Sequence, residues 1–537
     1  MDPVINSQTQ SATIRVLSTV ESAAGNFTHH VPDNVPPVSF TEVIASPTQA
    51  INSDGTSTGA RIVVPQLGYA EQMEFVREWQ WNDDAVTTIG SAIETPMIAS
   101  VFEMFEYAEL QSRRHPLQRL YARNMRNSDC RGSLAEGEML HKRSQFYAIP
   151  PVSGEWDLYV RESSGHLTQS GAGANQAVRY QCRCLLNFPV MHTAALQLQS
   201  LFVESLEVYI RLHPLVGDAT NSVFKSVPAN ESGMSDDHIS PTSVAIAATN
   251  MASDEVFLRI RYRNFHDETE NVILNENYQS GTPATILVQN TFAENAVPIT
   301  WPTALQRDAV RKLIDSTATS SEYLGSGLRT AIAAVTDAVQ ADVQMSSKNV
   351  VSSINFCLGT EIGGARTFRQ GWRLVEAELK ANGRNLYTLA EHDFPAHQRQ
   401  SFLKTPTPYG CADRAGLEYQ MNSSDVSHPS FPQAYQLQMG MQYSCDGQLF
   451  NTGALGLSSL TSTQLRTSWA PDWTELFEQV NGAGLPFGTA NTAATRCNVK
   501  DKIGRVWDNI QLYAYLEYYQ LLRIDPDNGA MTVSLDV

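Results

Sequence analysis

The chain ends on Gln511-Leu-Tyr-Ala-Tyr-Leu-Glu-Tyr-Tyr-Gln-Leu-Leu-Arg-Ile524, followed by Asp525-Pro-Asp-Asn-Gly529 and then by Ala530-Met-Thr-Val-Ser-Leu-Asp-Val537. Even positions from Leu512 to Ile524 are mostly apolar, whereas Glu517 and Arg523 stand at odd positions. This alternation is typical of a β-strand with one buried face. Proline and glycine in the middle segment favour a tight turn. The sequence therefore predicts a closing β-hairpin.

The same alternation recurs in both halves of the chain. Residues 206–212 alternate between apolar and polar side chains, and residues 375–381 do so up to the hairpin pair Asn382-Gly383. Residues 435–443 alternate in the same way before Asp446-Gly447. Further strands are predicted at residues 61–76, hinged at Pro65 and Gly68, and at residues 257–262.

Two segments have the spacing of helices. Between Ala99 and His115, apolar residues recur at helical spacing and basic residues precede Pro116, which predicts an amphipathic helix. Residues 305–343 also read as helical. The apolar residues that suggest the first helix are Val101, Met104, Phe105 and Ala108.

These signals predict three regions. Residues 1–36 are polar and form an N-terminal arm with little core of its own. Residues 37–300 form a first β-rich domain, which contains an exposed loop at 218–243. Residues 301–537 form a second one, entered through the helical segment. Two β-rich halves of similar size favour an all-β fold of two sandwiches or jelly rolls over a doubly wound sheet.

The share of charged residues and the net charge limit the classes of function that the chain could have. Only 18% of the 537 residues are charged, below the roughly 25% of an average domain, which suggests that much of the surface faces protein. The 38 basic and 56 acidic residues give a net charge of −18, which opposes general contact with a phosphate backbone. We therefore expect no sequence-independent binding of nucleic acid by the bulk surface. We also expect no direct sequence-specific nucleic-acid contact.

Other sequence signals give negative expectations. The seven cysteines include no Cys-x-x-Cys pair, so we expect reduced thiols and neither a zinc ribbon nor a dense disulfide framework. The first residues lack a signal-peptide pattern, and no apolar run of about 20 residues could span a membrane. We expect a protein made inside the cell, without a cofactor.

Several short patterns contain residue types found in binding or catalytic sites, but each has another interpretation. Glu391-His-Asp-Phe-Pro-Ala-His397 contains possible metal ligands, but Pro395 breaks a helical ligand face. Cys182-Arg-Cys184 favours core packing, and Gly325-Ser-Gly327 lacks the rest of a phosphate-binding loop. Asp525–Gly529 is a turn without the last ligand of a calcium loop. His-Glu-x-x-His is absent.

The tyrosines of the last long strand allow two interpretations. Tyr513, Tyr515, Tyr518 and Tyr519 could form a platform on which sugars stack, with Trp469 as a further aromatic side chain. In a strand, however, they divide between two faces, which favours packing in a core or an interface. No catalytic, cofactor-binding or metal-binding residue is assigned.

Four segments, in order along the chain, resemble double jelly-roll major capsid proteins of eukaryotic DNA viruses, a group that includes virophages, Polinton-like viruses and nucleocytoplasmic large DNA viruses. The first is Ile62–Gly68, with Val64-Pro65 and Gly68 in place. The second runs from Cys184 to Leu212, with Phe188-Pro189 and Ala195-Leu-Gln-Leu198. The fourth is Leu521-Leu-Arg-Ile524.

The third segment, Gly453–Leu465, matches at Gly453, Ser458 and Leu465. It departs from the pattern at Gly456, Ser459 and Thr461, where the family prefers Asn, Arg and Asp. The chain is thus similar to a divergent member of the family.

The resemblance implies two tandem jelly rolls with short inserted helices and a structural role in the virion rather than an enzymatic one. It implies a homotrimer that forms a pseudo-hexagonal capsomer of an icosahedral shell. Its partners would be neighbouring capsomers, penton proteins and minor capsid proteins, with an underlying membrane or inner protein layer as a further possibility and no small-molecule substrate. A scaffold or minor capsid protein of the same fold is one alternative. A carbohydrate-binding or carbohydrate-cleaving double β-sandwich is an alternative of another class.

Overall fold

We describe the fold from a computed structural model of the chain. It describes residues 38–65, 69–81, 93–94, 104–112, 115–125, 146–149, 157–158, 179–186, 188, 206–218, 222–223, 225–226, 244–245, 247–265, 284–299, 339–360, 372–390, 434–439, 442–445, 448–451, 454–471, 510–524 and 531–534. The predicted arm at 1–36 and most of the predicted helical segment lie outside these ranges.

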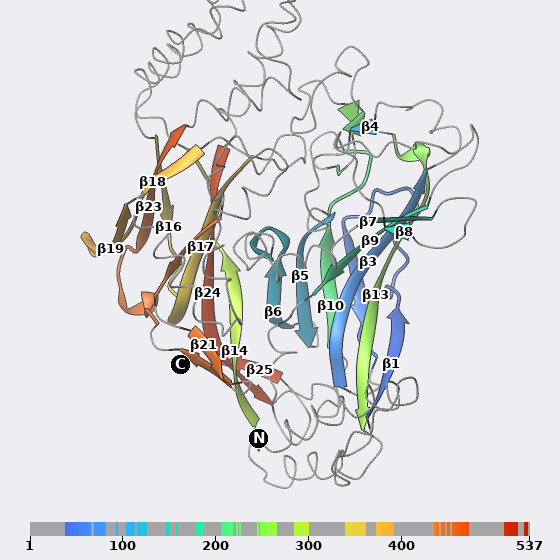
Figure 1. Cartoon of the computed structure of the whole chain (residues 1–537), viewed down its shortest axis with the longest axis horizontal. Helices are drawn as coiled ribbons and strands as arrows, with labels where there is room; N and C mark the ends of the chain where they lie inside the picture. The colour runs from blue at the N-terminus through green and yellow to red at the C-terminus, as the bar shows by residue number, and fades with distance from the viewer. Residues whose placement is uncertain are drawn as a thin grey trace, which may run out of the picture.

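Two antiparallel sheets form the first sandwich (Figure 1). Sheet N1 has the order β1 (Val38–Ala45), β13 (Met251–Phe265), β3 (Tyr69–Trp81) and β9 (Arg179–Leu185), and continues into β7 (Phe146–Ile149) and β8 (Asp157–Leu158). Sheet N2 has the order β2 (Gly59–Val63), β10 (Leu206–Leu212), β5 (Phe105–Ser112) and β6 (His115–Tyr121).

The second sandwich repeats this arrangement. Sheet C1 has the order β14 (Ala284–Ala293), β24 (Ile510–Ile524), β17 (Val350–Thr360) and β20 (Ala434–Gln438). Sheet C2 has the order β16 (Val339–Gln344), β23 (Gln464–Pro471), β18 (Trp372–Ala381) and β19 (Arg384–Ala390). β15 (Val297–Pro298) and β25 (Met531–Ser534) also pair with β24.

Both sandwiches are wound in the same way. If the eight principal strands of each are numbered in chain order, one sheet reads 1-8-3-6 and its partner reads 2-7-4-5 in both halves. Neighbouring sheet positions are thus filled by strands distant in sequence, as in an eight-stranded jelly roll built from two Greek keys. The prediction of two tandem jelly rolls is confirmed.

Several short strands and helices lie outside the four main sheets. β4 (Ile93–Glu94), β11 (Lys225–Ser226) and β12 (Val244–Ala245) form a three-stranded sheet, and β21 (Gln442–Cys445) pairs with β22 (Gln448–Asn451). The short helices in the described residues are a turn of α-helix at 122–125 and the 3-10 helices η4 (Ala248–Asn250) and η7 (Leu457–Ser459).

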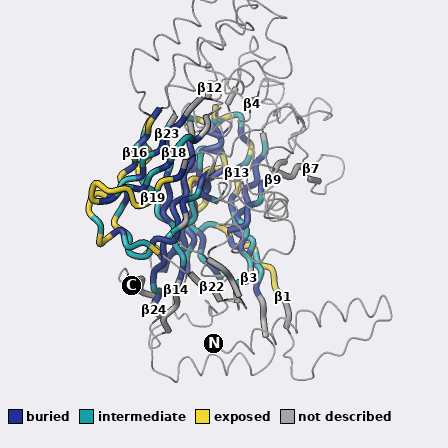
Figure 2. Tube along the Cα trace, turned by 60° about the vertical axis from the view of Figure 1, so that its left-hand side comes forward, coloured by how far each residue is buried: buried dark blue, intermediate teal, exposed yellow. Residues whose placement is uncertain are grey.

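Each sandwich encloses its own hydrophobic core, seen as the dark interior strands in Figure 2. Phe75, Trp79 and Phe105 are among the fully buried side chains of the first core. In the second, Phe356 stacks on Tyr435, and the ring of Trp469 meets both edge-on. Such rings bury large apolar areas and pack well in tilted or edge-to-face pairs.

Two predicted hairpins are confirmed. β24 runs into β25 with Ile524 opposite Met531. β18 and β19 join through Asn382 and Gly383, which have φ angles of 53° and 74°. Asn-Gly favours this left-handed geometry because a two-residue hairpin turn of type I′ needs positive φ at both positions.

The predicted helix at 99–115 is wrong, because residues 105–112 form β5. In the pairing with β10, Tyr107 lies opposite Arg211 and Phe105 opposite Leu212, which leaves Glu106 as an extra residue. This irregularity turns Phe105 to the core side occupied by Ala108, three residues later. The bulge therefore gives this strand the spacing of apolar residues that is typical of a helix.

The second helical prediction and the domain boundary also differ from the structure. Residues 339–343 belong to β16, so the end of the predicted helix is a strand. β14 pairs with β24 of the second sandwich, so the strands of that sandwich begin before residue 301. Pro298, just before the predicted boundary, lies in the short strand β15, a position that sheet edges tolerate.

Two strand predictions and one loop prediction need smaller corrections. In β18 the pairing passes over Val375, so Leu374 is the buried residue. The predicted strand at 435–443 divides, since β20 ends at Gln438 and β21 begins at Gln442. The predicted loop at 218–243 contains β11.

Candidate functional site

The two sandwiches meet along a seam, which we define as β6 and residues 122–125 of the first sandwich together with β14, β17 and β24 of the second. In Figure 1, β6 faces β14 at the centre of the molecule, and sheets C2, C1, N2 and N1 follow one another from left to right. The seam therefore fixes the orientation of one jelly roll relative to the other.

Side-chain amides join the two edge strands of the seam. The carbonyl of Leu117 accepts hydrogen bonds from Asn290 Nδ2 (3.2 Å) and Gln520 Nε2 (2.9 Å). Gln118 Nε2 donates to the carbonyl of Gln289 (2.8 Å), and the amide of Arg119 donates to Asn290 Oδ1 (3.2 Å). Edge strands present backbone groups that need partners. Here side chains satisfy them, so the two sheets stay separate.

A carboxylate lies at the centre of a buried polar network on sheet C1. Glu517 accepts hydrogen bonds from Ser353 Oγ and Asn355 Nδ2, both at 2.5 Å, and from Gln289 Nε2 at 3.3 Å. Asn355, which is fully buried, also donates to Asn124 Oδ1 of the first sandwich (3.1 Å). The network therefore crosses the seam and restricts its geometry, because buried polar groups need specific partners.

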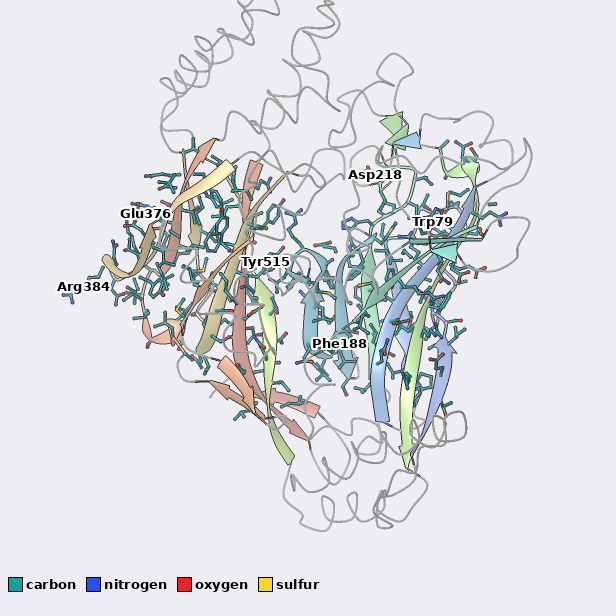
Figure 3. The ribbon with its side chains drawn as sticks, viewed as in Figure 1. Trp79, Phe188, Asp218, Glu376, Arg384 and Tyr515 are labelled. Carbon is teal, nitrogen blue, oxygen red and sulfur yellow. The ribbon has the colours of Figure 1, made fainter. Side chains whose placement is uncertain are left out.

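Aromatic and cationic side chains pack beside this network. The guanidinium of Arg123 lies 3.5 Å from the ring centre of Tyr513, a favourable cation–π geometry. The rings of Tyr121 and Tyr515 lie 5.6 Å apart across the seam, and Figure 3 shows Tyr515 between the sandwiches. Burial raises the pKa of the Tyr519 phenol above its usual range. Apolar contact is continuous too, since Val288 and Leu522 belong to the same hydrophobic cluster as Leu117.

The strand tyrosines are confirmed as packing residues. Tyr515, Tyr518 and Tyr519 are buried, and Tyr513 is half-buried under Arg123. Trp469 is 1% exposed and donates from Nε1 to Thr467 Oγ1 at 2.7 Å. The buried rings of Tyr515, Tyr518, Tyr519 and Trp469 therefore offer no exposed face on which a sugar could stack. Tyr515 and Tyr519 are buried on the face that the sequence predicted to be polar, whereas Glu517 and Leu521 on that face are half-buried, so β24 is more deeply buried than predicted.

A buried ion pair, which the sequence did not reveal, spans the first sandwich. Arg77 Nε and Nη2 donate to Asp254 Oδ1 and Oδ2 at 2.9 and 2.7 Å, and neither side chain is exposed. Arg77 Nη1 also donates to the carbonyl of His213 at 2.7 Å. The pair thus ties β3 and β13 of sheet N1 to the end of β10 in sheet N2. No local pattern marks this pair, since Arg77 lies between Val76 and Glu78 in a segment of mixed polar and apolar residues.

The predicted cysteine packing is confirmed for Cys182 and Cys184, which lie in the first core as free thiols. Burial raises the pKa of Cys182 to about 12. Within the described residues, no cluster of three or more His, Cys, Asp or Glu side chains could hold a metal ion. The segments Glu391–His397, Gly325–Gly327 and Asp525–Gly529 lie outside the described residues. No described helix is long and apolar enough to cross a membrane.

We predict that Cys182, Cys184 and Cys357 resist alkylation by iodoacetamide at pH 8.5 in the native protein and react fully in denaturant, because thiolates are the reactive form and all three side chains are buried. Mass spectrometry of tryptic peptides measures each site separately. Rapid alkylation of Cys182 in the folded protein would show that this part of the core opens to solvent.

The comparisons with known proteins address the fold. No family model and no curated protein matches the chain. The crystal structure of PBCV-1 VP54, fitted into a cryo-EM reconstruction of the virophage Sputnik, matches with a TM-score of 0.53 and 10% identity, covering 95% of this chain and 99% of that chain. A quasi-atomic model of the PBCV-1 virus capsid matches with a TM-score of 0.51, 10% identity and the same coverage of both chains. The chain is a double jelly roll with the overall fold of these viral capsid structures.

Proposed function

We propose that the chain is a major capsid protein, and that three copies close into a pseudo-hexagonal capsomer of an icosahedral DNA virus shell. The observation that carries this proposal is the pair of identically wound jelly rolls held side by side by the seam. Three copies of such a pair place six similar sandwiches around one axis. Such a ring has only threefold symmetry, but its outline is nearly hexagonal, so it can pack against six neighbouring capsomers.

The mechanism is structural. A closed ring of three identical chains uses heterologous contacts, in which one patch meets a different patch on the next copy. Obligate interfaces of this kind commonly bury about 2,000–5,000 Å² of surface. Only 18% of the residues in the chain are charged, and a surface with few charges suits such burial. The rigid seam supports assembly because each copy then presents its two outer faces at a fixed angle.

The proposal carries expectations for location and partners. The protein would lie in the virion shell and contact neighbouring capsomers, penton proteins and minor capsid proteins. The net charge of −18 fits a shell whose bulk surface does not touch packaged DNA directly. A minor capsid or scaffold role is separated by copy number in purified particles, since a major capsid protein is the most abundant shell component.

We predict a stable trimer for the purified full-length chain, with a mass three times the 59.3 kDa of one copy. Native mass spectrometry across a concentration series measures this, and obligate association predicts a trimer over the whole accessible range. A glycan array with the same protein serves as a control for the carbohydrate-binding alternative. A monomer at high concentration, or specific glycan binding without assembly, would contradict the proposal.

A further inference from the structure

The fifth strands of the two jelly rolls, β6 and β19, share an irregularity. Each follows its fourth strand after a two-residue loop. In each ladder the pairing then passes over the third residue of the strand, which is Leu117 in β6 and Leu386 in β19. The same residue type therefore stands at the same bulged position of the same strand in both jelly rolls.

These equivalent leucines lie in different surroundings. Leu117 is 2% exposed because the seam covers it. Leu386 is 44% exposed, at the outer edge of sheet C2. Figure 3 places Arg384, the first residue of β19, at the side of the second sandwich far from the first. Leu386 thus has the local geometry of a seam residue without a second sandwich against it.

The surface of the first jelly roll that β19 of another copy would contact is exposed as well. Within the chain, β6 meets β14 and β24, the first and eighth strands of the second jelly roll. The corresponding strands of the first jelly roll are β1 and β13. β1 is an edge strand, and it carries Ile44 at 65% exposure. Ile44 and Leu386 are the large hydrophobic side chains that stand exposed in the described part of the chain.

We propose that β19 of one copy packs against β1 and β13 of the next copy, repeating between chains the seam that β6 forms with β14 and β24 within the chain. This inference rests on the proposed trimer and names its interface. β1 and β19 lie at opposite sides of the molecule (Figure 1), so the contact is heterologous and three repeats close a ring. Leu386 and Ile44 become buried at the contact, as Leu117 is in the seam.

The first test is the variant Leu386→Asp, with Ser458→Asp as a matched control at an exposed site of the same sandwich. A buried carboxylate without a partner is strongly disfavoured. We expect Leu386→Asp to raise the concentration needed for half-assembly at least about 30-fold, as hot-spot truncations do. Ser458→Asp should assemble as the unmodified chain does. Both variants should fold, because both sites are exposed in the single chain.

The second test locates the contact. One preparation carries Ile44→Cys and another Leu386→Cys, and the two are mixed and treated with a short bismaleimide. We expect a cross-link between Cys variants of different copies, mapped by peptide mass spectrometry, and none when Ser458→Cys replaces Leu386→Cys. A trimer that tolerates Leu386→Asp and gives no such cross-link overturns this interface and leaves the proposed function standing. An unmodified chain that stays monomeric overturns both.

Discussion

Replacing Asp254 with alanine is expected to destabilise the first sandwich by about 3–5 kcal/mol, because the variant leaves the guanidinium of Arg77 buried without its counter-ion. The remaining hydrogen bonds from Arg77 to the carbonyls of His213 and Met104 do not neutralise the charge. Urea unfolding followed by tryptophan fluorescence measures the change. The effect should be seen in the transition that exposes the first core, which contains Trp79.

The same strand provides the control for this prediction. Arg259 of β13 pairs with Glu42 at 2.6 Å, but both side chains are substantially exposed. Removing an exposed pair costs roughly 0–1 kcal/mol, so Glu42→Ala should be nearly neutral. The double variant Arg77→Met with Asp254→Leu should recover most of the lost stability, since apolar residues often replace a buried pair at little cost. Equal effects of Asp254→Ala and Glu42→Ala would contradict the account of the buried pair.

Replacing Trp469 with alanine is expected to destabilise the second sandwich by about 3–5 kcal/mol. The ring is 1% exposed, it packs edge-on against Phe356 and Tyr435, and its Nε1 donates to Thr467 Oγ1. The variant therefore opens a cavity and removes a hydrogen bond at the same site. Differential scanning calorimetry should show a lower transition temperature for one sandwich.

A matched substitution separates packing from surface effects. Thr388 lies exposed on β19 of the same sandwich, so Thr388→Ala should leave the transition nearly unchanged. The carbohydrate-binding interpretation makes the opposite prediction for Trp469, namely lost glycan binding with unchanged stability. A stable, folded Trp469→Ala variant would show that this ring is not part of the core.

Strands with local signals could be predicted from the sequence. β10 alternates strictly because one of its faces packs on the core, and the hairpin of β18 and β19 is specified by Asn382-Gly383. β5 could not be predicted, since its bulge at Glu106 breaks the alternation on which strand prediction depends. The predicted boundary at residue 301 falls after β14, because β14 pairs with β24 near the other end of the chain and that pairing has no local signature.

The site depends on contacts between residues that lie far apart in the sequence. Arg77 and Asp254 are 177 residues apart, and Gln520 is 403 residues from the carbonyl it binds. Neither pairing has a local signature. The tyrosines of β24 were correctly expected in packing, but the buried network around Glu517 was not predicted, because it requires knowing that the first sandwich covers that face. Polar residues of an internal interface look like surface residues in a sequence.

Cryo-electron microscopy of the purified full-length chain tests the central claim most directly. The account predicts a threefold particle of six similar lobes, in which the seam recurs within each copy and β19 meets β1 between copies. A monomer, or an assembly of another symmetry in which the outer faces of sheets N1 and C2 stay in solvent, would contradict it.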